Sequence, residues 1–185
     1  MAPENKQGKA VALSRVSYWL LPAAAERAWL AALIKRLASR FGGPVFAPHL
    51  TVYSGPAPRA AEPGRILQEA AGQGAGELRL RCTGLDFTDK FTKACFLGFA
   101  PEPRLLRLSA TLRAASSSPA AEYRLQPHLS LFYGSLRDSE RQWIRELVEL
   151  PAAVRFDGVT AMATSARTTS AAAVASWRQL ASHRL

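Results

Sequence analysis

Two hexapeptides of this chain, PHLTVY at residues 48–53 and PHLSLF at residues 127–132, have nearly the same sequence. Each contains a histidine, and each has a hydroxyl side chain two residues after that histidine. The chain has only three histidines, and two of them occupy the same position in these hexapeptides. We interpret the repetition as a duplicated half-site, in which each hexapeptide supplies one half.

The spacing of these residues predicts one polar face on each hexapeptide. Side chains alternate between the two faces of a strand, so His49 and Thr51 share a face, as do His128 and Ser130. An imidazole exchanges a proton near neutral pH, and a hydroxyl donates a hydrogen bond to an anionic oxygen. Two such strands facing each other would enclose one small anion. One histidine could deprotonate a water while the other protonates a leaving oxygen, which suits metal-free hydrolysis of a phosphodiester.

A purely structural explanation is also open for each histidine. A single strand histidine is often half-buried and hydrogen-bonded to a backbone group. However, a structural duplicate has little need of a hydroxyl in both copies, because valine or isoleucine fits a pleated surface better. The repeated pair therefore favours a paired site.

Composition indicates a globular protein with an anionic partner. The chain has 185 residues, 48% of them hydrophobic, and a formal net charge of +10. This length predicts one domain or two intimate lobes. The positive charge favours a ligand of the phosphate type, with a compositional bias toward arginine and alanine as an equal alternative explanation. No run of about five or six basic residues marks a nucleic-acid arm.

The sequence also predicts where the protein resides. Residues 1–9 are polar and unlike a secretory signal, and no stretch of about 18 apolar residues could span a membrane. Cys82 and Cys95 fall on strands that we expect to be neighbours. Two buried thiols are favoured there over one disulfide bridge. So few cysteines favour a cytoplasmic protein without a membrane partner.

Periodicity along the chain predicts strands alternating with helices. Strands are expected at residues 11–20, 48–53, 78–87, 94–99 and 123–133. Helices are expected between Pro22 and Gly42, at residues 62–71, from Pro103 onward, and from a cap at Asp138 to a stop at Pro151. In the first helix Trp29, Leu30, Leu33, Ile34, Leu37 and Phe41 form the apolar stripe. Residues 171–185 fit helix and strand equally well.

The fold class follows from the strand pattern. Alternation of apolar and polar residues is typical of sheets with one wet face, which favours an α+β fold with antiparallel lobes over a doubly wound parallel sheet. We expect two similar lobes, each an antiparallel sheet with outer helices, around a central cleft lined by the wet faces. Residues 10–185 would form this single bilobal domain, and residues 1–9 a flexible tail.

The paired motifs resemble those of the two-histidine phosphoesterase superfamily. The surroundings look specifically like cyclic phosphodiesterases of the plant and yeast type. The sequence segments that carry this resemblance are SYWLLP at 17–22, FGGPVFAPHLTV at 41–52, KACFL at 93–97 and PHLSLFY at 127–133. The resemblance covers most of the chain. It implies a pseudo-two-fold axis, a metal-free site without a cofactor, and opening of 2′,3′-cyclic nucleotides or ADP-ribose 1″,2″-cyclic phosphate.

The resemblance also implies roles for individual residues. His49 and His128 would be the acid and base, and Thr51 and Ser130 would hold the nonbridging phosphate oxygens. Tyr133 matches an aromatic hydroxyl near the family's phosphate site. Strand parity would point Tyr133 away from His128, so this role requires a bend at Gly134.

Other residues are candidates for substrate binding. Trp19 could stack on a base or on adenosine, although a core tryptophan is an equal alternative. Phe91 and Lys93 correspond to a cleft-lining strand, where Lys93 replaces the family's usual uncharged polar residue. His183 stands alone and is expected at the surface.

Three functions therefore remain open. The first is a monomeric cyclic phosphodiesterase acting on a small cyclic phosphate or nucleotide, with a bell-shaped pH profile whose limbs lie near the histidine reference value of about 6.5. The second is a relative that trims or seals 2′-5′ linkages at RNA ends. The third is a noncatalytic nucleotide-binding module, which the presence of all four motif side chains disfavours.

Overall fold

The computed structural model describes residues 13–57, 62–72, 76–116 and 123–185. Its elements are, in chain order, β1 (Leu13–Pro22), α1 (Ala24–Phe41), β2 (Leu50–Pro56), α2 (Glu62–Gly72), β3 (Leu78–Phe87), the 3₁₀ turn η1 (Phe91–Lys93), β4 (Cys95–Phe99), α3 (Pro103–Ala114), β5 (His128–Phe132), α4 (Asp138–Leu147), β6 (Ala153–Ser165), α5 (Ala171–Ala175) and β7 (Arg178–Arg184). The predicted tail at residues 1–9 lies outside the described residues.

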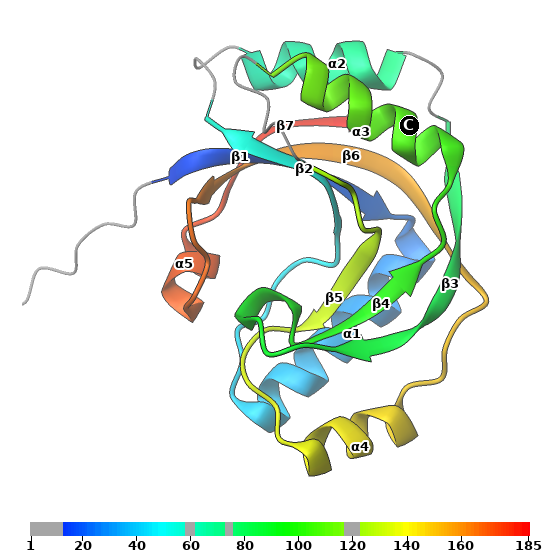
Figure 1. Ribbon diagram of the computed structural model, residues 1–185, viewed down its shortest axis with the longest axis vertical. Helices are drawn as coiled ribbons and strands as arrows, with labels where there is room; N and C mark the ends of the chain where they lie inside the picture. Colours follow the sequence, from blue (N-terminus) through cyan, green and yellow to red (C-terminus); the bar gives the residue numbers. More distant parts are fainter. Residues whose placement is uncertain (1–12, 58–61, 73–75, 117–122) are drawn as a thin grey trace, which may run out of the picture.

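The described strands form one antiparallel sheet in the order β1-β2-β5-β4-β3-β6-β7. Because β1 also pairs with β6, six of the strands close into a ring, and β7 lies along the free edge of β6. The α+β class and the antiparallel arrangement are confirmed. The two antiparallel sheets that we expected, one in each lobe, are instead hydrogen-bonded into one continuous, strongly curved sheet (Figure 1).

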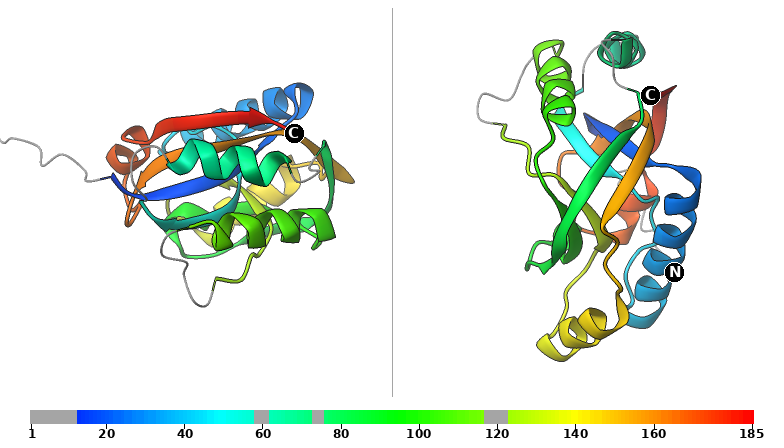
Figure 2. Two further views of the ribbon diagram at one scale, coloured as in Figure 1. Left: turned by 90° about the horizontal axis from the view of Figure 1, so that it is seen from above. Right: turned by 90° about the vertical axis from the view of Figure 1, so that its right-hand side faces the viewer.

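α1, α2 and α3 cover the outer side of this curve, whereas α5 lies at its open mouth (Figure 1). α2 packs on β6 and β7, α3 packs on β2, and α1 packs on β1 and β5 (Figures 1 and 2). Leucines on the outward-facing positions of the motif strands, Leu50 and Leu129, are completely buried. The inner side of the curve is therefore left for polar side chains, as the alternating pattern predicts.

The sequence of α1 determines both its buried face and the residue at which it ends. Leu30, Ile34 and Leu37 recur at the spacing of one helical face, and all three are buried. Gly42 follows the helix in the left-handed conformation, with φ 76°, and donates its N–H to the carbonyl of Ala38. Trp29 was expected in the same stripe, but it lies at the edge of the packed face and is 36% exposed.

Some boundaries differ from those expected. β5 begins only at His128, so residues 123–127 are not strand. Asp138 is the first residue of α4 rather than its cap. The cap is formed by the Glu140 carboxylate, which accepts a hydrogen bond from the backbone N–H of Arg137 at 2.8 Å.

The ambiguous C-terminal stretch contains both structures, because α5 is followed by β7. Cys82 and Cys95 are free thiols, of which Cys95 is buried. His183 is exposed on β7, as expected. Among the described residues, no helix is long and apolar enough to cross a membrane.

Candidate active site

The two motif strands meet at one residue pair. Leu50 of β2 is the antiparallel partner of Leu129 of β5, and these leucines hold the same position in the two hexapeptides. An antiparallel pair has a local two-fold axis through its midpoint, so the two motifs are related by rotation about this pair. In this register His49 lies opposite Ser130, and Thr51 lies opposite His128. The pairing therefore brings all four motif side chains to one place.

The same symmetry extends to a bulge in each motif strand. Between β1 and β2 the partner of Trp19 is Thr51 and the partner of Tyr18 is Tyr53, so Val52 is an extra residue. Each bulge directly follows the hydroxyl residue of its motif, because Leu131 is the corresponding extra residue of β5 against β4. A bulge changes the face on which later side chains emerge.

This change of face explains the position of Tyr133. Strand parity predicts that Tyr133 points away from Ser130, whereas the extra residue Leu131 reverses the parity. Tyr133 consequently lines the same cavity as His49 and His128. The required irregularity lies before Tyr133, at the bulge, rather than at Gly134.

The two histidines are held in the same way. His49 Nδ1 lies 2.7 Å from the carbonyl oxygen of Ala47, and His128 Nδ1 lies 2.7 Å from that of Gln126. Since a carbonyl only accepts, each ring donates from Nδ1. Nε2 of each histidine makes no hydrogen bond to another described residue, so it is the nitrogen left for chemistry.

An aromatic ring from the neighbouring strand supports each histidine, but the two contacts differ. Trp19 stacks on His49 with ring centroids 3.7 Å apart and an interplanar angle of 15°. Phe96 meets His128 edge-on, with centroids 5.5 Å apart. His49 is thus enclosed, whereas His128 is partly exposed.

This difference in enclosure is reflected in the proton affinities. Burial lowers the pKa of His49 from 6.5 to about 4, against the opposing effect of the Ala47 carbonyl and with a smaller lowering by His128. Burial also lowers the pKa of His128, with a further lowering by the positive charge of Lys93. Both imidazoles are therefore neutral at pH 7 in the free protein, with His49 the harder to protonate.

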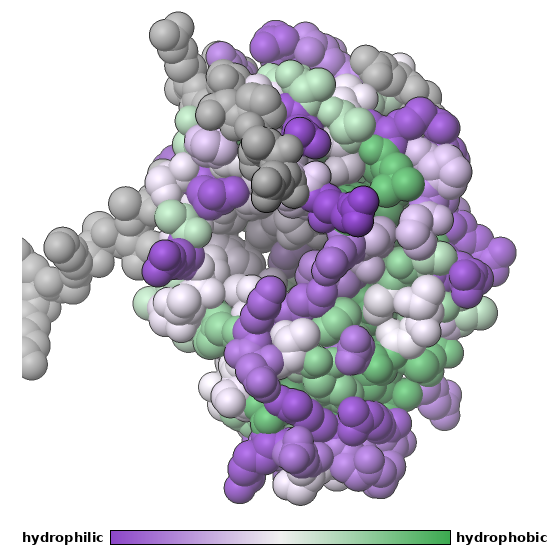
Figure 3. Space-filling model, in the orientation of Figure 1, coloured by the Kyte–Doolittle hydropathy of each residue, from purple (hydrophilic) through white to green (hydrophobic). Residues whose placement is uncertain are grey.

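All four motif side chains line one cavity of about 350 Å³. The remaining lining residues are Lys90, Thr92, Lys93, Tyr123, Arg124, Gln126 and Tyr133. Three of these side chains are cationic, and no carboxylate is among the described residues that line the cavity. This face of the molecule is hollowed near its centre, and hydrophilic side chains border the hollow (Figure 3). Such a positively charged hollow suits an anion.

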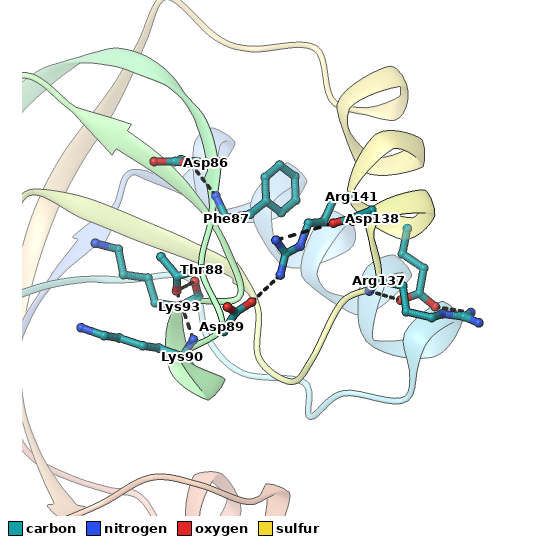
Figure 4. Close-up of polar contacts among 10 residues, drawn as sticks. Asp86, Phe87, Thr88, Asp89, Lys90, Lys93, Arg137, Asp138 and Arg141 are labelled. Atoms are coloured by element: carbon teal, nitrogen blue, oxygen red, sulfur yellow. Dashed lines mark hydrogen bonds and ion pairs between the residues drawn. The ribbon is translucent and has the colours of Figure 1, made fainter.

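The turn between β3 and β4 is fixed by three successive carbonyl groups. The carbonyl of Phe91 accepts from the Gly134 N–H at 2.9 Å, that of Thr92 from the Ser130 hydroxyl at 2.8 Å, and that of Lys93 from the Thr88 hydroxyl at 2.6 Å. Lys90 and Lys93 project from this turn to the same side, away from the ion pair between Asp89 and Arg141 (Figure 4). The turn therefore presents its cations to the cavity from a fixed backbone.

The two motif hydroxyls are not equivalent. Ser130 is buried, and its one hydroxyl proton is donated to the Thr92 carbonyl. Thr51 is half-buried, and its hydroxyl makes no hydrogen bond to another described residue. In this conformation Thr51 is free to donate to a ligand, whereas Ser130 would first have to rotate its proton away from Thr92.

The other candidate residues lie at different depths. Lys93 lines the cavity, and its ammonium lies 4.3 Å from the centre of the Phe96 ring. Trp19 is buried and reaches the cleft as the support of His49. Phe91 packs beside Tyr133, with centroids 6.1 Å apart, and is not among the residues that line the cavity.

Sequence reasoning missed several neighbours of the histidines. Phe96, Thr92 and Gln126 fall in or next to stretches already singled out, but no motif marked them. Trp177 contacts His49 from the far end of the chain, with centroids 6.0 Å apart. The proline before each histidine, which gives the repeated x-Pro-His, was the available signal for the carbonyl that holds the ring. Within the described ranges, no group of three or more His, Cys, Asp or Glu side chains is placed to hold a metal ion.

Comparison with known proteins gives a family match over most of the chain. Residues 14–179 match the model of the family described as cyclic phosphodiesterase-like protein. A search of curated proteins finds no match.

Solved structures show the same fold. One is a phosphoesterase with 18% sequence identity and a TM-score of 0.60, covering 93% of this chain and 98% of that one. Escherichia coli LigT complexed with 3′-AMP has 20% identity and a TM-score of 0.58, covering 93% and 98%. Usb1 of Kluyveromyces marxianus has 14% identity and a TM-score of 0.51, covering 92% and 99%.

Proposed function

This chain belongs to the family of cyclic phosphodiesterase-like proteins, within the two-histidine phosphoesterase superfamily, and on that premise we propose that it opens cyclic phosphodiesters to phosphomonoesters without a metal ion. The observation that carries the proposal is the symmetric pair of histidines. In each of them Nδ1 donates a hydrogen bond to a backbone carbonyl, and Nε2 is available for proton transfer. Both rings line one cationic cavity without a carboxylate among its described lining residues.

The enclosure of the two histidines supports a division of roles. His49, whose pKa is about 4, stays neutral and takes a proton from the attacking water at Nε2. His128, the more exposed of the two, carries the proton that the leaving ribose oxygen needs. The water oxygen forms the new bond to phosphorus while the bond to one ring oxygen breaks, and His128 donates its proton to that oxygen. The histidines then exchange protons with solvent before the next turnover.

Neighbouring groups support the charge that builds on the phosphoryl oxygens. The Thr51 hydroxyl is a free donor for a nonbridging oxygen, and Lys93 brings a positive charge from the fixed turn. Tyr133, whose pKa is raised by burial against the opposing effect of a hydrogen bond with Ser130, keeps its phenol protonated beside the Ser130 hydroxyl. A five-membered cyclic phosphate is strained, so these groups suffice where an unstrained diester would need more help.

Nucleoside 2′,3′-cyclic phosphates and ADP-ribose 1″,2″-cyclic phosphate are the proposed substrates. The similar protein LigT has been solved with 3′-AMP, with NADP⁺ and with ATP, which supports a nucleotide ligand in this fold. The alternative function, which uses the same two-histidine chemistry, is trimming or sealing of 2′-5′ linkages at RNA ends.

The direct test is hydrolysis by chelator-treated protein. We expect 2′,3′-cyclic AMP and ADP-ribose 1″,2″-cyclic phosphate to be converted to monoesters in the presence of EDTA, with the broken bond identified by phosphorus NMR. Restoration of activity only by a divalent metal would contradict the proposed mechanism. Inactivity on both substrates, with cleavage or sealing of 2′-5′-linked RNA, would favour the alternative.

The pKa values predict an acidic optimum for kcat/KM. The base must be neutral, so the rate falls as the pH decreases through the pKa of His49, about 4. The acid must be protonated, so the rate also falls as the pH rises through the pKa of His128, which lies below 6.5. We therefore expect a maximum between about pH 4 and 6.5 in a profile measured from pH 3.5 to 9. This revises the expectation of two limbs near 6.5, and a maximum above pH 7 would be inconsistent with it.

A further inference from the structure

A second cavity, of about 220 Å³, adjoins the candidate active site on the side of His49. It shares His49, Thr51, Thr92 and Tyr133 with the first cavity. Its other lining residues include Arg15, Ser17, Ser54 and Thr164. The two cavities are therefore parts of one groove that continues past the histidines.

Arg15 gives this second cavity a positive charge that no described acidic group neutralises. Its Nε and Nη2 donate to the side chain and the carbonyl of Ser54, at 3.3 and 2.9 Å. No carboxylate lies within ion-pair distance of Arg15 or among the residues of this cavity in the part of the chain that the structure describes. A half-buried guanidinium held by neutral partners keeps its attraction for an anion.

A chain of three hydroxyls, the last two of them buried, leads from Arg15 into the cavity. Ser54 Oγ lies 2.8 Å from Ser17 Oγ, and Ser17 Oγ lies 3.1 Å from Thr164 Oγ1. Because the guanidinium only donates, Ser54 accepts a hydrogen bond from it. The Ser54 hydroxyl can then donate a hydrogen bond to Ser17, and the Ser17 hydroxyl can donate one to Thr164. The proton of Thr164 is then the free donor at the end of a polarised chain.

The groove has a different character on the other side of His128. There a cavity of about 550 Å³ is lined by Gly84, Gly98, Phe96 and Leu125 among others. Gly84 and Gly98 are cross-strand partners. A Cβ on Gly84 would meet nothing within 4 Å, whereas one on Gly98 would lie 2.8 Å from the Thr83 hydroxyl oxygen. The open backbone at Gly84, beside Phe96 and Leu125, offers a surface that suits a flat ring.

The shape of a ribose matches this arrangement. The cyclic phosphate closes across O2′ and O3′, while the base on C1′ and the 5′ carbon on C4′ leave the sugar on opposite sides of that edge. With the cyclic phosphate between the histidines and the base beside His128, the 5′ substituent enters the cavity of Arg15. We propose that this cavity binds a phosphate on the 5′ oxygen of a nucleoside 2′,3′-cyclic phosphate. The inference rests on the proposed function and specifies its substrate class.

The test compares substrates with and without the second phosphate. The parent should prefer 2′,3′-cyclic AMP carrying a 5′-phosphate over 2′,3′-cyclic AMP by about tenfold to a hundredfold in kcat/KM, the range of one or two charge-assisted hydrogen bonds. Arg15→Gln should reduce this preference to near one. Arg79→Gln makes the same change of charge at an exposed position on β3 outside the groove and should retain the preference. Equal losses on both substrates in Arg15→Gln, or no preference in the parent, would overturn the proposal.

A second variant tests the same cavity in case Arg15→Gln does not fold. Thr164→Val removes the terminal hydroxyl and with it the hydrogen bond to the buried Ser17 hydroxyl. It should lower the preference several-fold, with a lower melting temperature but a protein that still folds. A dinucleotide ending in a 2′,3′-cyclic phosphate distinguishes the sources of the phosphate. If it is favoured as much as the 5′-monophosphate, the site takes the end of an RNA chain, and otherwise it takes a free nucleotide.

A binding measurement separates this proposal from the proposed function. Calorimetric titration with adenosine 3′,5′-bisphosphate and with 3′-AMP requires no turnover. Tighter binding of the bisphosphate by the parent, lost in Arg15→Gln, would support the subsite even if no cyclic phosphate were hydrolysed. Equal binding of the two nucleotides would refute the subsite even if hydrolysis were observed.

Discussion

Replacing His128 by Gln should lower kcat for 2′,3′-cyclic AMP by about a hundredfold to ten-thousandfold, the usual contribution of a positioned acid or base. Gln keeps a polar side chain of similar reach but cannot deliver a proton to the leaving oxygen. His128 is only partly buried and meets Phe96 edge-on, so the fold should tolerate the change. His49→Gln should cause a loss of the same order by removing the base.

The pH dependence of the variants identifies the role of each histidine. The His128 variant should lose the alkaline limb of kcat/KM, and the His49 variant should lose the acid limb. The third histidine offers a matched control, because His183 is exposed on β7 and lines neither cavity, so His183→Gln should keep full activity. Combined replacement of His49 and His128 should cost little more than either change alone, since residues that act as a unit are not additive. Retained activity in both single variants would exclude the two-histidine mechanism.

The local pattern of the hexapeptides was sufficient to predict which residues meet. Parity alone places His49 beside Thr51 and His128 beside Ser130, and the repeated hexapeptide predicts that the two pairs face one site. The convergence of these four side chains in one cavity follows from the Leu50–Leu129 pair. Similarly, the 3.6-residue period and Gly42 were enough to predict α1 and its end.

What could not be predicted depends on partners distant in the sequence. Whether Leu131 is an extra residue is decided by the register with β4, so the side on which Tyr133 emerges is not encoded in β5 alone. Arg15 and Trp177 reach the groove because β6 pairs both with β1, which contains Arg15, and with β7, which Trp177 directly precedes. The difference between the two histidines likewise arises from tertiary packing, since the hexapeptides themselves are nearly identical.

Thr51→Val is expected to have the second largest effect on turnover. Valine has the shape of threonine and fits a strand well, so the change removes one hydroxyl donor and little else. Loss of a donor to the developing charge costs about a hundredfold to a thousandfold in kcat. The rate of 2′,3′-cyclic AMP hydrolysis should fall by that factor with an unchanged melting temperature, and Thr51→Ser should restore most of it.

Ser130→Ala should differ from Thr51→Val in stability as well as in rate. The Ser130 hydroxyl donates to the Thr92 carbonyl, so its removal leaves an acceptor of the β3–β4 turn unpaired, at a cost of about 1–3 kcal/mol. We expect a lower melting temperature, together with a rise in KM as Lys93 loses its fixed position. Since Thr51 holds no part of the fold through its hydroxyl, the two variants separate a group that contacts substrate from one that positions others. If both lowered kcat equally without a change in melting temperature, the serine would instead rotate to bind phosphate, and the two motifs would be equivalent in function as they are in sequence.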